Sequence, residues 1–440
     1  MLYRLIKKYL SNAVAILAAS FWSFNFYIHA TVYQMGLETP IAALCIVYLI
    51  YKLSIFEERW RTEKITLKEI TWLGFLSALV MFSRLDLVFL AVIIGVWILF
   101  RGTFIRYLLP LDILIIFISM TSSVILRTDF TSYNIFYSTS AVEATIIAII
   151  LKTLALYFLG AYQHPRTYSI FKNILNIFYA TGIGSAITAS IYLFLIQIGF
   201  VENFPRSAFL LDFGISLLLF VALRLTAYLF SNPSHRLSAS SALAQLKSNF
   251  QTWWREGIAY YGVLGSLLIA YMLFNHFAFG TSSPVSGQIK RWWGSLPNTA
   301  YERPVFNWDA YFGVGVQGYN ALQPFSDFFQ VISNYLRPIL AGAEFENERF
   351  YIMLLLFSVL CFILLLLNQQ KIRQTNRYFS LIPLAASCGI QMLSYTATGY
   401  GGAKEWYWVS QMIFFTLLFS LLVQYVLTPI LKKRIYSLWG

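Results

Sequence analysis

Long apolar stretches recur along the whole chain, and they constrain its fold more than any other feature. VFLAVIIGVWILF runs from Val88 to Phe100 and YIMLLLFSVLCFILLLL from Tyr351 to Leu367, both without a charge. Stretches of about 17–25 apolar residues have the length of helices that cross a bilayer. Only 12% of the residues are charged, against about 25% in soluble domains. The sequence therefore predicts an all-α polytopic membrane protein.

The apolar segments and the loops between them predict about 12 transmembrane helices. Their expected bounds are 11–30, 40–56, 70–83, 87–100, 107–126, 139–161, 173–199, 207–231, 257–279, 350–368, 378–398 and 406–428. Three regions follow from these bounds. They are an N-terminal transmembrane region at 1–279, an extracytoplasmic segment with interfacial helices at 280–349, and C-terminal transmembrane helices at 350–440.

Positive charge is unevenly distributed among the predicted loops, and the formal net charge is +13. With strict alternation of the helices, one set of loops holds most of the basic residues: Arg4, Lys7, Lys8, Arg59, Arg61, Lys64, Lys68, Arg101, Arg106, Arg166, Lys172, Arg236, Lys247, Arg255, Lys371, Arg373, Arg377, Lys432, Lys433 and Arg434. An excess of Lys and Arg is typical of cytoplasmic loops. These loops and the N-terminus are therefore predicted to be cytoplasmic. The net charge then reflects topology, and we expect no nucleic-acid partner.

The segment SRLD places Arg84 and Asp86 between two apolar stretches that otherwise form one run of nearly 30 residues. A charged side chain at the bilayer centre costs about 2.5–3.5 kcal/mol on insertion scales. We therefore predict a turn between two short helices, at the outer surface. There the pair has two interpretations. Arg84 binds a phosphate through its guanidinium while Asp86 orients it or holds a metal, or the two form a purely structural pair.

Glu38 lies in another short loop on the predicted outer side, just before Pro40. Its carboxylate either binds a substrate hydroxyl or a metal, or it is an ordinary acid at the start of the next helix, where the helix dipole favours negative charge.

Two basic residues on the same side are candidate phosphate ligands. Lys290 precedes Arg291, Trp292 and Trp293, a combination that suits either an anionic headgroup or simple anchoring at the membrane interface. Lys404 follows the glycines of GYGGAKEWYW, which allow a close approach of backbone to ligand.

Ionisable residues also lie inside predicted spans, and these are candidate functional residues by default. They are Asp112, Glu143, Lys152, Asp212 and Arg224, and they share no common spacing. We therefore assign no proton relay. Cys45, Cys361 and Cys388 show no CxxC pattern and are interpreted as packing residues.

Three of the outer segments, in this order, resemble the GT-C superfamily of membrane glycosyltransferases. They are Gly36-Leu37-Glu38-Thr39, Arg84-Leu85-Asp86, and the pattern F-G-T-x-x-P-x-S-x-x-x-K from Phe279 to Lys290. The likeness covers about the first 110 residues and the region near 275–295, and it is greatest to bacterial arabinofuranosyl- and mannosyltransferases. The resemblance thus implies a GT-C-like fold in the bacterial inner (plasma) membrane.

The resemblance also implies a function. It implies inverting transfer of a sugar from a polyprenyl-phosphate-linked donor to a glycan, lipid or protein acceptor on the outer face. Arg84, Lys290 and Lys404 would contact the donor phosphate. Glu38 and Asp86 would shape the site or hold a divalent cation, Mg²⁺ or Mn²⁺.

One departure from the family concerns the catalytic acid, which the family carries in its first outer loop. Here GLET follows a single predicted span, so we expect the two helices and the loop that bears this acid to be absent. An inverting transfer needs a carboxylate to deprotonate the acceptor and cations to stabilise the leaving phosphate. We assign candidates to the second role and no catalytic base. The expectation is then either an N-terminally truncated glycosyltransferase or a relative that has lost catalysis.

Two other functions stay open from the sequence. The helix count and the intramembrane charges also suit a flippase or polymerase of lipid-linked envelope glycans. A secondary transporter is the third alternative, although such folds usually show paired broken helices in two repeats.

Overall fold

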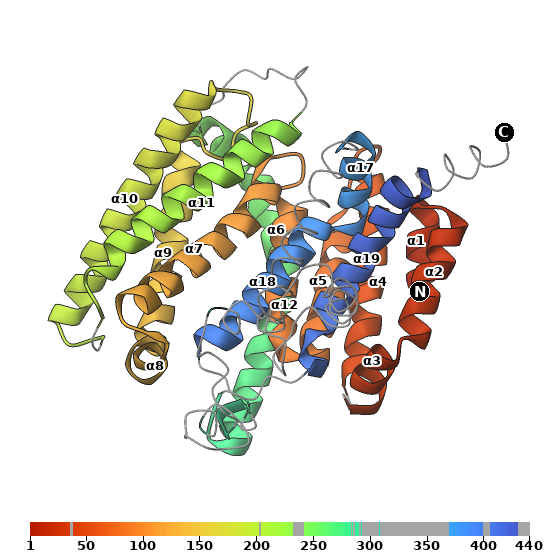
Figure 1. The fold of residues 1–440 in the computed structure, drawn as a ribbon, viewed down its shortest axis with the longest axis horizontal. Coiled ribbons are helices and arrows are strands. Elements are labelled where there is room, and N and C mark those ends of the chain that lie inside the picture. Colours follow the sequence, from red (N-terminus) through yellow and green to blue (C-terminus); the bar gives the residue numbers. More distant parts are fainter. Residues whose placement is uncertain are drawn as a thin grey trace, which may run out of the picture.

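The structure, a computed structural model, describes residues 1–35, 38–201, 204–231, 242–282, 369–398 and 405–429, with positions 284, 287–289, 292 and 308. All the extended regular elements in these residues are helices (Figure 1). The first half comprises α1 (Leu2–Tyr9), α2 (Asn12–Phe24), α3 (Phe26–Ile28), the π-helical turn η1 (His29–Met35), α4 (Thr39–Arg59), α5 (Leu67–Ser83), the 3-10 turn η2 (Leu85–Leu87), α6 (Val88–Leu99) and α7 (Ile105–Arg127).

The second half continues in the same helical manner. It comprises α8 (Phe130–Ser132), η3 (Tyr133–Tyr137), α9 (Ser138–Phe158), α10 (Ile170–Gln197), α11 (Ala208–Phe230), α12 (Ala242–Phe279), α17 (Gln369–Phe379), α18 (Leu381–Ala397), η5 (Glu405–Trp408), α19 (Val409–Leu422) and η6 (Val423–Leu427).

The described residues include seven helices long and apolar enough to cross a membrane, or eight if a bent pair counts as one span. That pair is α2 with the segment from Phe26, which turns by 50° where 11–30 was predicted as a single helix. The helices α6 with η2, and α18, are apolar but shorter, and α5 has 17 residues. The predicted span 350–368 lies outside the described residues. A multi-pass helical protein is therefore confirmed, while the count of about 12 stays a prediction.

Local sequence explains where several helices begin. Thr66 caps α5, because its hydroxyl accepts from the backbone N–H of Glu69 while the Glu69 carboxylate accepts from the N–H of Thr66. Asn25 caps the segment after the 50° bend by accepting from the N–H of Ile28. Pro40 lies in the first turn of α4, where its missing N–H costs no hydrogen bond.

Successive long helices run in opposite directions, so the bundle has two distinct ends (Figure 1). We call the end with Arg61 and the loop 60–66 the basic end, and the opposite end, with Glu38 and Arg84, the Arg84 end. Salt bridges at the basic end join segments far apart in sequence: Lys8 to Glu58, Arg106 to Glu57, and Arg101 to Glu256. The loops predicted to be cytoplasmic thus lie together, to the extent that the structure describes them.

Buried apolar side chains form two large cores. One is shared by α1, α2, α4, α5, α6, α12, α18 and α19, and the other by α7, α9, α10 and α11 with the end of α18. Figure 1 shows the second group on the left and α1, α2 and α4 on the right, with α6 and α18 between them. Helices from the first 100 residues therefore pack directly against those from the last 70.

Candidate functional site

Arg84 and Asp86 lie in a break between two helices, as predicted. The helix α5 ends at Ser83, the turn η2 covers Leu85–Leu87, and α6 begins at Val88. Arg84 itself is extended, with φ −158° and ψ 122°, which directs its side chain away from the axis of α5. The break spares both charges a position in the middle of an apolar helix.

The two side chains form a bidentate ion pair. Arg84 donates from Nε to Oδ1 of Asp86 at 3.1 Å and from Nη2 to Oδ2 at 3.0 Å. This planar pairing is the strongest geometry available to a guanidinium and a carboxylate. Because the Arg84 side chain is only 5% exposed, little water screens the pair.

Three other segments surround Arg84. Its Nη1 donates to the carbonyl oxygen of Trp406 at 2.9 Å and makes a long contact of 3.5 Å with Oγ1 of Thr39. The ring of Tyr407 lies against the guanidinium, with its centroid 4.3 Å from Cζ. Trp406 and Tyr407, about 320 residues away in sequence, therefore form one wall of this site.

Asp86 has partners beyond Arg84. Its Oδ2 accepts from Nε2 of Gln391 at 2.7 Å and from the hydroxyl of Tyr395 at 2.7 Å. Gln391 in turn accepts at Oε1 from Ser410, and Tyr395 stacks on Tyr407 with a centroid distance of 5.6 Å. Both carboxylate oxygens of Asp86 are thus engaged, so Asp86 holds Arg84 in place in this arrangement.

The charge of Arg84 is well maintained. Burial alone would lower the pKa of this guanidinium, but the charge of Asp86 and its hydrogen bonds outweigh burial. The pKa of Arg84 is therefore raised above its ordinary value. A permanent positive charge lies at this end of the bundle.

Glu38 is the accessible acid of the site. Its Oε1 lies 3.9 Å from Nη1 of Arg84, and its side chain is 51% exposed. Glu38, Arg84 and Asp86 therefore come together from two loops, with Arg84 between the two carboxylates. Lys290 and Lys404 lie outside the described residues.

Gln391 and Tyr395 were missed by sequence reasoning. The signal was present, because Gln391 and Gln411 are amides inside predicted spans, where polar groups are rare. Their pairing with Asp86 depends on how α18 packs against the turn η2, which no local pattern indicates.

The predicted divalent cation has one accessible ligand here, Glu38. Within the described part of the chain, no group of three or more His, Cys, Asp or Glu side chains is arranged to hold a metal. The metal thus stays a prediction, and it would need further ligands from elsewhere.

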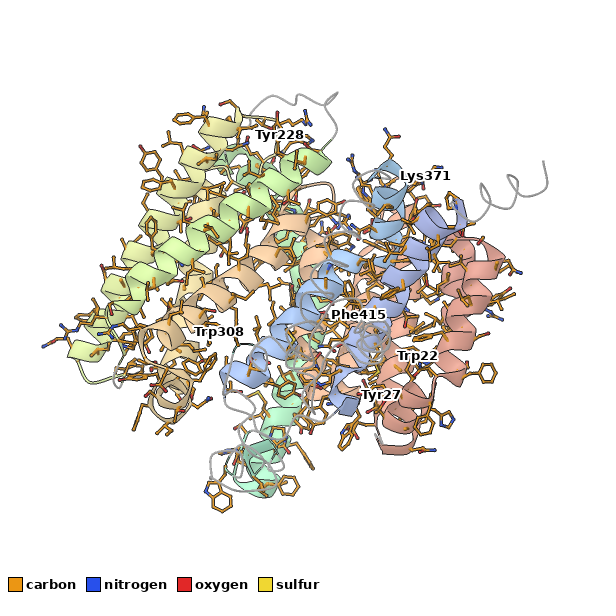
Figure 2. The ribbon with its side chains drawn as sticks, in the orientation of Figure 1. Trp22, Tyr27, Tyr228, Trp308, Lys371 and Phe415 are labelled. Carbon is orange, nitrogen blue, oxygen red and sulfur yellow. The ribbon has the colours of Figure 1, made fainter. Side chains whose placement is uncertain are left out.

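An apolar groove of about 250 Å³ begins near the site. It runs between α2 and α4 and is lined by Met1, Leu2, Tyr3, Ala19, Trp22, Ser23, Tyr33, Pro40, Ala43, Leu44 and Val47. Trp22 is labelled in Figure 2, and its indole N–H donates to the hydroxyl of Tyr33 at 3.1 Å. Pro40, which follows Thr39 in sequence, lines the groove at the start of α4.

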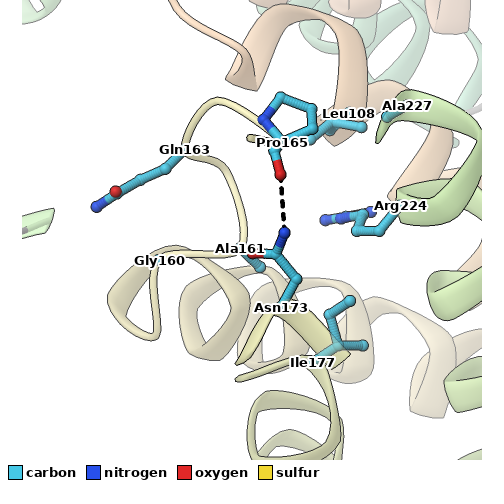
Figure 3. Close-up of a pocket in the computed structure, with 9 residues that line it drawn as sticks. All are labelled: Leu108, Gly160, Ala161, Gln163, Pro165, Asn173, Ile177, Arg224 and Ala227. Carbon is cyan, nitrogen blue, oxygen red and sulfur yellow. Dashed lines mark hydrogen bonds between the residues drawn. The ribbon is translucent and has the colours of Figure 1, made fainter. Parts of the chain in front are cut away.

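A second hollow lies near the basic end, between α11 and the loop after α9. Figure 3 shows Arg224 directed toward it, beside the hydrogen bond from Asn173 to the carbonyl of Pro165. Its volume of about 20 Å³ suits a single water-sized molecule. It is too small for a sugar or a lipid headgroup.

Four of the five intramembrane charges are paired with one another, and these pairs lie apart from the Arg84 site. Nζ of Lys152 contacts Oδ2 of Asp212 at 2.6 Å, and Arg224 forms a bidentate pair with Asp112. All four side chains are buried, and they join α7, α9 and α11. Glu143 accepts from the Tyr192 hydroxyl at 3.4 Å.

The chain was compared with protein-family models, curated proteins and solved structures. No family model, curated protein or solved structure matches it, so the geometry of the Arg84 site is the ground for a functional assignment.

Proposed function

We propose that this protein is a GT-C-type glycosyltransferase of the bacterial plasma membrane, with its N-terminus in the cytoplasm. It transfers a sugar from a polyprenyl-phosphate-linked donor to an acceptor of the cell envelope on the outer face. The Arg84 end is then the outer, catalytic end.

One observation carries the proposal. Glu38 from GLET and Arg84 and Asp86 from SRLD, two of the three motifs behind the family resemblance, are in contact. A third outer segment, KEWYW, joins them through Trp406 and Tyr407. The meeting of the two loops beside an exposed carboxylate, Glu38, supports a shared role in binding.

The chemistry assigns a role to each side chain. As the sugar leaves, negative charge builds up on the donor phosphate, and a fixed cation stabilises it. Arg84 supplies that charge, pre-oriented by Asp86. Its weakest contacts, to Thr39 at 3.5 Å and Glu38 at 3.9 Å, are those that a phosphate oxygen would displace. Glu38 then accepts hydrogen bonds from sugar hydroxyls, and Lys290 and Lys404 contribute further positive charge. The proton of the acceptor hydroxyl goes to a carboxylate base that we do not assign among these residues.

The neighbouring groove supports a lipid-linked donor. Its walls are mainly apolar, and Ile41 and Leu44 beside it are each 59% exposed, as expected of a helix face turned toward hydrocarbon. A polyprenyl chain lying along α4 would place its phosphate near Thr39 and Arg84.

The test is sugar transfer in proteoliposomes, with labelled polyprenyl-phosphate mannose and arabinofuranose as donors. Glu38→Gln is expected to lower the rate about tenfold or more without lowering the unfolding temperature, because this side chain is half exposed. Arg84→Gln is expected to lower it about a hundredfold. Asp129→Asn and Arg127→Gln are matched controls, since both residues are exposed at the same end.

Three results would count against the proposal. Normal transfer by folded Glu38→Gln and Arg84→Gln would remove these residues from the site. Movement of lipid-linked glycan across the bilayer with no transfer would favour the flippase. Exchange of a small solute, without sugar transfer and without movement of lipid-linked glycan, would favour a transporter.

A further inference from the structure

The corner between α17 and α18, at the basic end, combines positive charge with polar atoms that have no hydrogen-bond partner. Nε of Arg377, Oδ1 of Asn376 and Oγ of Ser380 are all buried and unpartnered in the structure. Ser380 is 1% exposed. Buried polar groups without partners are rare, because each has lost its hydrogen bonds to water without gaining others in the protein. Three within five residues indicate a ligand.

Arg377 also lies beside another cation. It is four residues from Arg373, hence on the same face of α17, and like charges at this spacing repel. Burial and the charge of Arg377 lower the pKa of Arg373. An anion between the two guanidinium groups would remove this repulsion.

The described acids of the basic end are committed to other cations. Glu57 pairs with Arg106 and Arg61, Glu58 with Lys8, Glu63 and Glu69 with Arg59, and Glu256 with Arg101. Among the described residues, Arg377 has no carboxylate within salt-bridge distance. The sequences 232–241, 350–368 and 430–440, which lie outside the described residues, contain no Asp or Glu.

The backbone of the corner adds donors. Ser380 has φ 50°, a left-handed conformation that turns the chain sharply, and its N–H donates to the carbonyl of Arg377 at 3.3 Å. The helix α18 then starts, and the N–H groups of Leu381 and Ile382 in its first turn have no partner within the helix. Such groups and the helix dipole favour an anion.

We propose that this corner binds a phosphate group, with Arg373 and Arg377 as its cations and the Ser380 hydroxyl and the first turn of α18 as further donors. A phosphate has enough oxygens for both guanidinium groups and the hydroxyl. The amide of Asn376 joins them once rotated by half a turn, which presents its NH₂ in place of Oδ1. The phosphate belongs either to an anionic phospholipid headgroup at the membrane surface or to a soluble phosphate compound.

The first experiment uses the full chain in neutral detergent, with inorganic phosphate as the probe. Phosphate is expected to raise the unfolding temperature relative to chloride at equal ionic strength. Arg377→Gln is expected to weaken the apparent affinity for phosphate about tenfold or more. The matched control is Lys371→Gln, because Lys371 is an exposed cation on the same helix (Figure 2), and its affinity change should stay below about twofold.

A second variant separates binding from folding. Ser380→Gly removes the hydroxyl but tolerates the positive φ better than serine does. Its unfolding temperature without phosphate is therefore expected to hold or rise, while the stabilisation by phosphate falls.

The second arm identifies the source of the phosphate. Native mass spectrometry counts the phosphatidylglycerol retained from mixed micelles, with phosphatidylcholine as the zwitterionic reference. Retention of phosphatidylglycerol that depends on Arg377 assigns the site to a lipid. Inorganic phosphate binding with no such retention assigns it to a soluble compound. Equal losses in Arg377→Gln and Lys371→Gln, or no response to either probe, would overturn the proposal.

Discussion

At the scale of single residues, the main feature of the molecule is its buried ion pairs. Lys152 and Asp212 are fully buried, and Ser216 and Ser119 complete their hydrogen bonds at 3.1 and 2.7 Å. A buried ion pair adds little net stability compared with an apolar pair of similar volume, but removal of one partner leaves an unpaired charge. The pair of Arg84 and Asp86 follows the same rule. The charge of Arg84 in the candidate site and the charge of Lys152 in the bundle are thus each compensated by a neighbouring carboxylate.

Lys152→Met is expected to destabilise the protein by about 3–5 kcal/mol, because it leaves Asp212 buried without its counter-charge. The double variant Lys152→Met with Asp212→Leu should recover most of that loss. Thermal unfolding in one detergent measures both. Equal destabilisation by the single and the double variant would contradict this account of the pair.

At the scale of elements, small residues determine how closely the helices approach. A Cβ added to Gly74 of α5 would lie 2.8 Å from the backbone oxygen of Tyr260 in α12. The hydroxyl oxygen of the same tyrosine lies 2.7 Å from Oγ of Ser77 and 2.7 Å from the carbonyl oxygen of Ala91, so it is within hydrogen-bond distance of both. One side chain of α12 thus joins α5 to α6, the two helices that hold the turn with Arg84.

Gly74→Ala is expected to lower the unfolding temperature by several degrees, because backbone atoms of α12 cannot move aside cheaply. Gly265→Ala is the matched control, since a Cβ there meets nothing within 4 Å and alanine favours the helix. We expect its unfolding temperature to be unchanged or slightly raised. Similar losses in both variants would show that the close approach of α5 and α12 is not the cause.

At the scale of the whole molecule, the bundle separates its charges between two ends. One end holds Arg61 and Lys64 in the loop 60–66 and Lys68 in the first turn of α5, while the other end holds Glu38 and Arg84. The proposed function requires the Arg84 end to be outside. The proposed phosphate site lies at the opposite end, so the two sites would serve different sides of one membrane.

Glu38→Cys and Lys64→Cys, made in a chain whose native cysteines are replaced, test this directly. Both native side chains are exposed. A membrane-impermeant thiol reagent added to intact cells is expected to label position 38 and to reach position 64 only after the membrane is opened. Labelling of both positions in intact cells, or of position 64 alone, would reverse or refute the topology.

Several features of the molecule were predictable from the sequence because they depend on neighbours along the chain. Apolar run length predicted the helices, Thr66 and Glu69 mark the start of α5, and Arg84 with Asp86 marked the break after it. The bend at Asn25 within the predicted span 11–30 was missed, because a cap inside an apolar run gives a weak signal.

The partners of the polar groups were decided only by tertiary structure. The sequence presents Asp112, Lys152, Asp212 and Arg224 as scattered charges, and packing of α7, α9 and α11 pairs them. Packing likewise brings Gln391 and Tyr395 to Asp86, and Glu38 to Arg84. Hydrophobicity and helix capping act locally, so the order of residues along the chain is enough to fix them. Charge pairing and hydrogen bonding inside a membrane bundle act between side chains up to about 300 residues apart, and they exist only once the helices have packed.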